Sequence, residues 1–210
     1  MILKKTSKIF ILFFLISFLI VTYFFLNKYN YLLYEHGVKF FSLKDSFDKD
    51  IPLIPSFVWI YFLYFVVILS PIPIILEDTY FFIQTVVSYF LTYSIGFAFF
   101  LNYHIRMIRP SFHALDLSQK ALHFIYINDH GFNVFPSMHV ANTVLVALIF
   151  IGYNKKVGIF FSMLALLISM STLFIKQHYC LDVIAGFIEA LFIYIIIFRS
   201  KEIYKRFKKI

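Results

Sequence analysis

Uncharged apolar runs alternate with polar segments along the whole of this chain. A helix of about 20 apolar residues is long enough to cross the roughly 30 Å hydrocarbon core of a bilayer. Six runs approach or reach that length, at about 9–26, 52–70, 80–102, 137–153, 157–174 and 181–198. The pattern predicts an all-α fold, a polytopic membrane bundle of about six transmembrane helices that forms a single membrane domain over residues 1–210.

Two of the polar segments between these runs are long. The first, 27–50, mixes charged residues with Phe40 and Phe41, which favours an interfacial amphipathic helix and turn. The second, 104–133, holds two arginines and four of the seven histidines. A loop of that length in a small protein is usually functional, so we expect it to serve a site.

Composition agrees with a membrane protein. Hydrophobic residues make up 61% of the chain and aromatic residues 22%, and the mean hydropathy is +0.85, whereas soluble domains are about half apolar. The single cysteine, Cys180, excludes an internal disulfide and multi-cysteine metal motifs. The formal charge of +8 comes largely from basic residues at the ends of apolar runs, so we expect no nucleic-acid partner.

These basic residues also predict the topology. Eleven of the 19 Lys and Arg fall on one side if the N-terminus is cytoplasmic: Lys4, Lys5, Lys8, Lys155, Lys156, Arg199, Lys201, Lys205, Arg206, Lys208 and Lys209. Cytoplasmic loops are enriched in such residues. We therefore expect both termini in the cytoplasm and the protein in the cell (inner) membrane. The segments 104–136 and 174–180 are then extracytoplasmic. The first run has no Ala-x-Ala-like cleavage site, so we expect it to remain as a span.

The candidate chemistry lies at the edges of the later runs. His178 and Asp182 are four residues apart, which places both on one helix face, where a carboxylate can hold an imidazole in one tautomer. His139 follows Ser137 at the start of another run, as if directed at the same pocket from a neighbouring helix. Ionisable groups at membrane depth are costly, so their presence indicates function.

The same region has features that suit an anion. The runs beginning at Ser137 and near Leu181 would present helix N-termini on the outer face, where unpaired N–H groups attract phosphate. Arg109 and Arg106 lie on that side and can bind phosphate oxygens in a forked geometry. Lys176 stands two residues before His178. Together they predict an electropositive pocket for a phosphate ester.

These residues resemble the three signature motifs of the type 2 phosphatidic acid phosphatase superfamily. The matching motifs, within about 102–186, are Arg109-Pro110, Pro136-Ser137-Met138-His139, and Ser171 with His178 and Asp182. The surrounding residues, including 48–55, look most similar to the inositolphosphorylceramide-synthase-like branch. The resemblance extends over about residues 45–190.

The resemblance implies roles for individual residues. His178 would attack phosphorus and carry the phosphoryl group, Asp182 would orient it, and His139 would protonate the leaving oxygen. Arg109, Ser137 and Ser171 would bind the substrate, without metal or cofactor. Two positions depart from the family pattern: Asn102 stands where a lysine is usual and Thr172 where an arginine is usual. Arg106 or Lys176 would then supply the missing positive charge, and the loss of the second arginine resembles the synthase-like branch.

Several alternatives remain at this stage. The substrate would be a membrane lipid phosphate. With water as the acceptor the reaction is hydrolysis, and with an alcohol it is phospholipid head-group transfer. The sequence does not indicate an oligomeric state. One alternative is a metal-dependent hydrolase, in which the two histidines and Asp182 hold the metal. Another is an inactive membrane scaffold or a transporter. Glu189, two turns beyond Asp182, is either a proton-relay group or a buried structural one.

Overall fold

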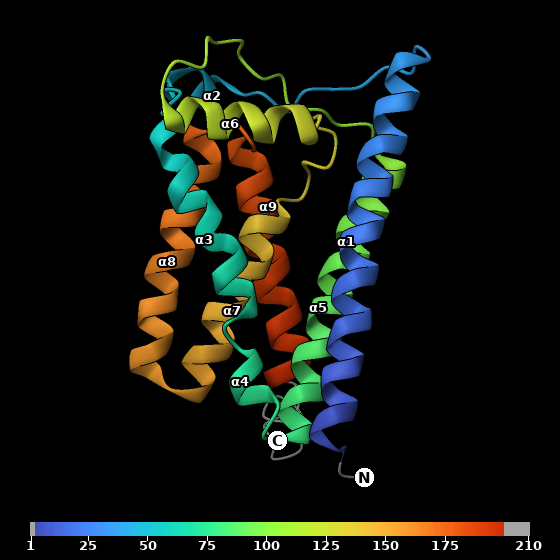
Figure 1. Cartoon of the computed structure of the whole chain (residues 1–210), viewed down its shortest axis with the longest axis vertical. Helices are drawn as coiled ribbons and strands as arrows, with labels where there is room; N and C mark the ends of the chain where they lie inside the picture. Colours follow the sequence, from blue (N-terminus) through green and yellow to red (C-terminus); the bar gives the residue numbers. More distant parts are fainter. Residues whose placement is uncertain (1–2, 200–210) are drawn as a thin grey trace, which may run out of the picture.

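The computed structural model describes residues 3–199, and this part of the chain is helical (Figure 1). The helices pack side by side as one bundle, with short elements at both ends. They are α1 (Lys5–Glu35), α2 (Ser46–Asp50), a 3-10 turn (Pro55–Phe57), α3 (Val58–Leu69), α4 (Ile72–Ile75), α5 (Thr79–Asn102), α6 (Leu117–Asn128), α7 (Met138–Tyr153), α8 (Lys155–Phe174) and α9 (Cys180–Tyr194), which continues as a π-helical turn (Ile195–Arg199).

The predicted polytopic all-α bundle is confirmed. Within residues 3–199, five segments are long and apolar enough to cross a bilayer: Lys5–Glu35, Pro55–Ile75, Thr79–Asn102, Lys155–Phe174 and Cys180–Arg199. The sixth apolar helix, α7, is shorter than the others at 16 residues. Its N-terminus lies deeper in the bundle than the neighbouring helix ends, below α6 (Figure 1).

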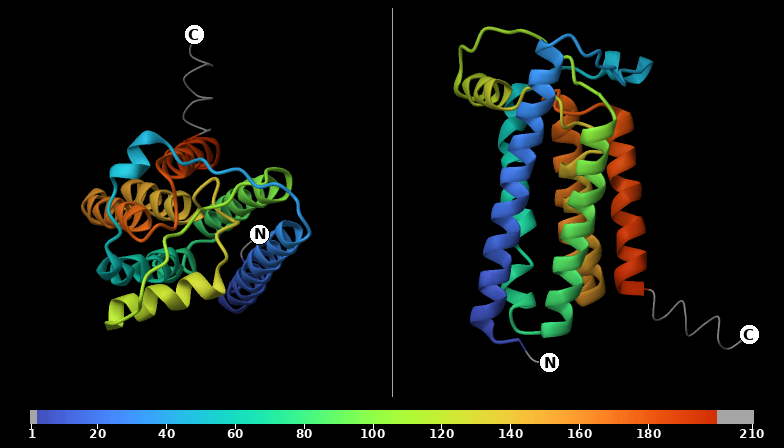
Figure 2. Two further views of the ribbon diagram at one scale, coloured as in Figure 1. Left: turned by 90° about the horizontal axis from the view of Figure 1, so that it is seen from above. Right: turned by 90° about the vertical axis from the view of Figure 1, so that its right-hand side faces the viewer.

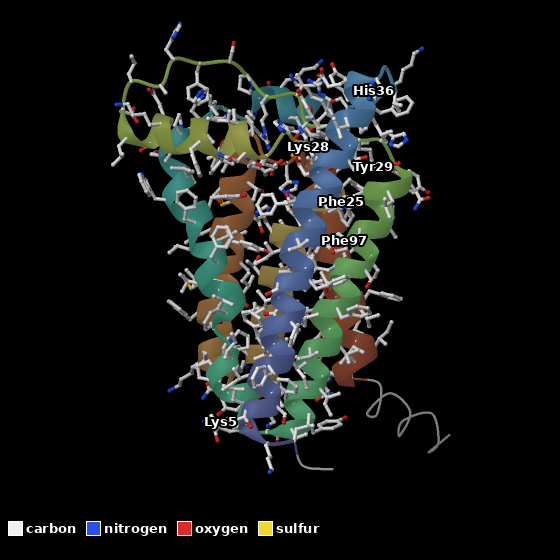
Figure 3. The ribbon with its side chains drawn as sticks, turned by 45° about the vertical axis from the view of Figure 1, so that its right-hand side comes forward. Lys5, Phe25, Lys28, Tyr29, His36 and Phe97 are labelled. Atoms are coloured by element: carbon white, nitrogen blue, oxygen red, sulfur yellow. The ribbon has the colours of Figure 1, made fainter. Side chains whose placement is uncertain are left out.

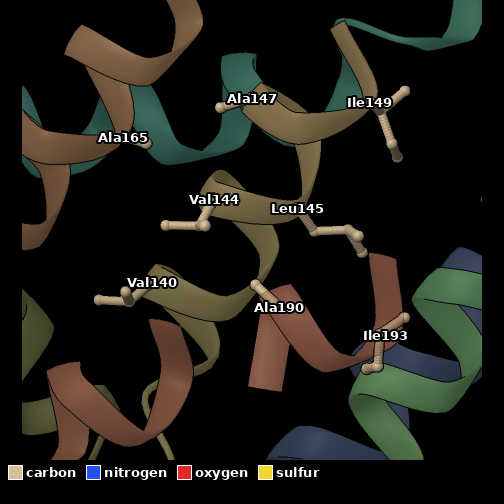
Figure 4. Packing of buried hydrophobic residues seen from close by; sticks show 8 residues of the cluster. All are labelled: Val140, Val144, Leu145, Ala147, Ile149, Ala165, Ala190 and Ile193. Atoms are coloured by element: carbon tan, nitrogen blue, oxygen red, sulfur yellow. The ribbon is translucent and has the colours of Figure 1, made fainter. Parts of the chain in front are cut away.

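Helix α7 forms the centre of the bundle. Twelve of its 16 residues are buried, and it packs against α8, α9, α3 and α5. Val140, Val144 and Leu145 of α7 form a core cluster with Ala165 of α8 and residues of α9 (Figure 4). A helix that is apolar on all sides is stable only where protein or lipid surrounds it. The central position of α7 satisfies this condition.

The segment 27–50 differs from the prediction. No amphipathic interfacial helix of that length forms; instead α1 continues through Glu35, and only the five residues of α2 are helical beyond it. Helix α1 continues because its polar residues find partners: Asn27 Nδ2 donates to Asp129 Oδ1 at 2.9 Å, and Asn30 Nδ2 donates to the Phe100 carbonyl at 2.9 Å. Buried amides whose NH₂ groups are hydrogen-bonded do not break a helix.

The segment 104–136 also contains a helix that we did not expect, α6. Asp116 accepts from the Gln119 N–H at 2.9 Å, and the Gln119 side chain accepts in return from the Asp116 N–H at 3.2 Å. This capping box starts the helix. Helix α6 lies across the end of the bundle, roughly perpendicular to α3 and α7 (Figure 1, Figure 2).

The two ends of the described chain lie on the same side of the bundle. Helix α1 starts there at Lys5, and its other end, near His36, lies at the opposite side of the bundle (Figure 3). Helix α9 returns to the side where α1 starts (Figure 2). That this side is cytoplasmic stays a prediction, and the basic residues from 201 onward, which contributed to it, lie outside the described residues.

Candidate active site

Four side chains form a row beneath α6, three of them from helices and the fourth, His178, from the turn between α8 and α9. The Tyr61 hydroxyl of α3 lies 2.7 Å from His139 Nε2, and His139 Nδ1 lies 3.2 Å from His178 Nε2. His178 Nδ1 is 3.5 Å from Asp182 Oδ2. All four side chains are buried. The structure thus brings together the three residues that the sequence predicted as catalytic, and it adds Tyr61, which the sequence did not reveal.

The start of α9 fixes the carboxylate of Asp182. Its Oδ2 accepts from the Tyr179 N–H at 2.8 Å, which caps the first turn of the helix. The same oxygen faces His178, so the cap and the histidine contact share one atom. The N–H of Cys180 is bound separately, by Asp48 Oδ1 at 2.9 Å. The geometry of His178 and Asp182 therefore depends on the backbone of α9 and on α2.

Ser137 joins α7 to α9 at the floor of the site. Its N–H donates to the Asp182 carbonyl at 3.0 Å, and its hydroxyl accepts from the Val140 N–H at 3.4 Å as the cap of α7. Gly186 permits this approach, because a Cβ atom there would lie 2.5 Å from the Ser137 carbonyl oxygen. The N-terminus of α7 is thus held beside His178 and Asp182, as an anion site would require.

Arg109 lies between the end of α6 and the residue before His178. Its Nη2 donates to Gln177 Oε1 at 2.7 Å, its Nη1 donates to the Asp129 carbonyl, and its guanidinium stacks over the Tyr126 ring at 4.7 Å. Within residues 3–199 its Nε has no partner, although it is buried. The guanidinium is therefore held in place with one N–H group, at Nε, that has no acceptor among the described residues.

Asp129 is a charged residue of the site that the sequence analysis missed. Its carboxylate lies 3.6 Å from Arg109 Nη2 and accepts hydrogen bonds from Asn27, Tyr23 and the Gly131 N–H. Burial by itself raises the pKa of Asp129, but Arg109 and the hydrogen bonds outweigh this effect and lower the pKa below its usual value. No motif or spacing connects Asp129 with α1, so the sequence carried no sign of it.

The other predicted substrate contacts lie elsewhere. The Ser171 hydroxyl donates to the Ile168 carbonyl at 2.7 Å within α8. The Arg106 guanidinium stacks on Tyr34 at 4.2 Å. The Lys176 ammonium donates to the Ile51 carbonyl at 2.6 Å, and burial lowers the pKa of Lys176. Among the described residues, none of the three contacts His139 or His178, so their contacts with substrate stay predictions.

A mainly apolar cavity of about 390 Å³ extends from the site along the bundle between α1 and α3. Leu15, Ile16, Phe65 and Ile72 are among its apolar walls, while Asp129, Asn128 and His139 lie at the end beneath α6. Helix α1 is attached at both ends of this cavity, by Lys8 Nζ to the Leu76 carbonyl at 2.8 Å and by Asn27 to Asp129. The cavity thus combines apolar walls with one polar end.

A family model agrees with this site. The model described as PAP2 superfamily matches residues 81–205, more than half of the chain. The chain belongs to the PAP2 superfamily. Comparisons with curated proteins and with solved structures gave no match.

The matched part of the PAP2 chain contains Arg109, Ser137, His139, His178 and Asp182. PAP2 superfamily members are generally phosphatases, and the family acts on lipid phosphates in general. Membership therefore supports an enzyme of phosphate-ester chemistry in a membrane, which agrees with the apolar helices. The inositolphosphorylceramide-synthase-like branch is a finer prediction that the family match leaves open.

Proposed function

We propose that this PAP2 protein hydrolyses or transfers the phosphate ester of a membrane lipid through a phosphohistidine on His178. The observation that supports this most is the row from Asp182 through His178 to His139, with distances of 3.5 and 3.2 Å. A nucleophile, its orienting carboxylate and a proton donor are the three groups that such a reaction needs.

In the proposed reaction, His178 Nε2 forms a bond to phosphorus while the bond from phosphorus to the ester oxygen breaks. Asp182 holds the Nδ1–H of His178 and stabilises the charge that develops on the ring. His139 gives its proton to the departing oxygen. Water or an alcohol then attacks phosphorus, His139 takes the proton back, and His178 is released. The 3.2 Å contact between the rings leaves no room for a phosphate, so they separate when substrate binds.

The cavity between α1 and α3 supports a lipid as the substrate. Its apolar walls suit an acyl chain, and its polar end at His139 suits the phosphate. Arg109 and the N-terminus of α7 would bind the phosphate oxygens. As a second candidate, an alcohol in place of water would make the protein a head-group transferase, as the resemblance to the synthase-like branch implies. Thr172, where the family usually has an arginine, favours this candidate.

The first experiment traps the phosphoenzyme. Purified protein is incubated in detergent with a panel of labelled lipid phosphates and phospholipids, with and without alcohol acceptors, and then denatured in alkali, which preserves a phosphohistidine. We expect an acid-labile phosphoryl label that is absent from His178→Ala. His36→Ala, an exposed histidine at the end of α1, is the matched control and should keep the label. Label that persists on folded His178→Ala would overturn the assignment.

A second measurement separates the two histidines. His139→Ala should slow departure of a poor alkoxide leaving group much more than that of a nitrophenol, which needs little protonation. Equal losses for both leaving groups would remove His139 from the role of acid.

The proposed reaction uses no metal. Within residues 3–199, no group of three or more His, Cys, Asp and Glu residues could hold a metal ion. The test is exhaustive chelation, which should leave activity unchanged. Loss with EDTA and rescue by a divalent ion would favour the metal-dependent hydrolase instead.

A further inference from the structure

The site holds few positive charges for a protein that binds phosphate. Arg109 is the cation beside the histidines, while Arg106 stacks on Tyr34 and Lys176 is bound to backbone carbonyls near α2. Two carboxylates belong to the same site: Asp129 pairs with this guanidinium, and Asp182 faces His178. The described residues around the phosphate position therefore carry little net positive charge.

The carboxylate of Asp129 is held in a fixed position by several hydrogen bonds. Its Oδ1 accepts from Asn27 at 2.9 Å and from the Gly131 N–H at 2.9 Å, and its Oδ2 accepts from Tyr23 at 3.2 Å. Three donors and a guanidinium hold one carboxylate, which keeps it ionised and in position. It also lines the polar end of the cavity together with His139.

We propose that Asp129 is a specificity-determining residue that makes the site select a phosphodiester, with one negative charge, over a phosphomonoester dianion. This inference rests on the proposed phosphohistidine reaction and narrows its substrate class.

The selection follows from the position of Arg109. Its Nη2 lies 2.7 Å from Gln177, the neighbour of His178, and 3.6 Å from Asp129. A phosphate that contacts both Arg109 and His178 is therefore separated from Asp129 by about the width of one guanidinium. Charge repulsion over such distances in a poorly hydrated site is large. A second negative charge on the phosphate would be repelled by the carboxylate, and among the described residues no second cation lies there to balance it. The site thus discriminates against the monoester dianion by repulsion.

In the reaction itself, His178 attacks the phosphodiester and the bond to one alcohol breaks. That alcohol departs with the proton from His139, and the other ester bond remains on the phosphohistidine. Water or an alcohol then takes the phosphoryl group. The remaining ester removes one charge throughout, so the intermediate also carries fewer negative charges beside Asp129.

The test uses two lipids that share one leaving group: phosphatidic acid, a monoester, and phosphatidylmethanol, its methyl diester. Release of diacylglycerol is measured at pH 8 with wild type and Asp129→Asn. We expect the ratio of kcat/KM for the diester to that for the monoester to fall by at least about tenfold in Asp129→Asn, the size expected for one charge pair. Asp129→Glu should keep the wild-type preference, because it keeps the charge.

A pH series on the wild type and on Asp129→Asn provides a second arm. A phosphomonoester loses its second charge below about pH 6, so the wild-type preference for the diester should shrink as the pH falls. The titratable and charged groups that face Asp129 are Tyr23, Tyr61, His130, His139 and Arg109. A change of charge on either histidine would also act unequally on the two substrates, so the part of the pH dependence that Asp129→Asn loses is the part that belongs to Asp129.

Glu77→Gln is the matched control, since it also removes one carboxylate, at the exposed end of the bundle where Lys5 binds it. It should leave the ratio unchanged. An unchanged ratio in folded Asp129→Asn, or a wild-type ratio that does not depend on pH, overturns the inference. Absence of both turnover and phosphoenzyme in the wild type with either lipid overturns the proposed function itself.

Discussion

Asp182 uses a single carboxylate oxygen for two purposes. Oδ2 accepts from the Tyr179 N–H and faces His178 Nδ1, while Oδ1 is buried without a hydrogen-bond partner among the described residues. The first contact starts α9 and the second orients the histidine. A substitution that keeps the acceptor but removes the charge separates these two purposes.

Asp182→Asn is that substitution. An amide oxygen can still accept from Tyr179, so the protein should fold, but a neutral amide cannot stabilise the charged His178 ring. By analogy with the serine-protease triad, the rate should fall by roughly 10³- to 10⁴-fold. Turnover and phosphoenzyme formation measure the loss, and thermal unfolding measures the fold. A folded variant within tenfold of the wild-type rate would contradict the orienting role.

At this scale the sequence predicted part of the site. The four-residue spacing of His178 and Asp182 predicted that they lie on one helix face. The two side chains do lie together, but His178 precedes α9, which begins at Cys180, so the prediction of a shared helix face is wrong. His139 lies beside His178 from α7, another helix, as the sequence predicted. Tyr61 and Asp129 were not foreseen. Each contacts the site across a long stretch of chain, Tyr61 through His139, 78 residues away, and Asp129 through Arg109, 20 residues away. Periodicity and spacing report only on neighbours within one element.

Among the elements, the contact of α9 with α7 determines where the site forms. Gly186 allows it, because any side chain there would meet the Ser137 carbonyl. The backbone of Ser137 is at the same time bound to the Asp182 carbonyl. The first turns of the two helices therefore act as one unit.

Gly186→Ala should disturb this unit. Its Cβ would lie 2.5 Å from a backbone oxygen, which cannot move without shifting α7. Overpacking of this kind costs about 1 to 3 kcal/mol, so we expect a lower unfolding temperature and a larger loss of turnover than of stability. Gly152→Ala is the control, because its Cβ would meet only the Tyr194 hydroxyl, at 3.0 Å. Equal effects of the two variants would contradict this account.

Hydrophobic runs predicted all six apolar helices, but polar segments were harder to interpret. The capping box at Asp116 and Gln119 would have revealed α6. The extension of α1 to Glu35 could not be predicted, since it depends on Asn27 and Asn30 finding partners in α6's end and in α5. Tertiary contacts of this kind override local polarity.

The molecule as a whole has a site near one end and both described chain ends at the other (Figure 1). If the positive-inside rule holds, the end with the site faces away from the cytoplasm. We propose this orientation in the cell membrane.

Cysteine labelling tests the orientation. With Cys180 replaced by serine, Leu115→Cys, in the exposed segment before α6, should react with an impermeant thiol reagent in intact cells. Lys155→Cys, at the opposite end where α8 begins, should react only after the cells are opened. The reverse pattern would place the site in the cytoplasm.

The cavity between α1 and α3 has a practical consequence for any measurement on the purified protein. Its apolar walls distinguish poorly between the acyl chain of a lipid and the alkyl tail of a detergent, because burial of hydrocarbon is not directional. In a micelle, the solubilising amphiphile is therefore a competitive inhibitor present in large excess. Apparent affinities will depend on tail length and on the mole fraction of substrate, so specificity is best compared in nanodiscs of one defined lipid.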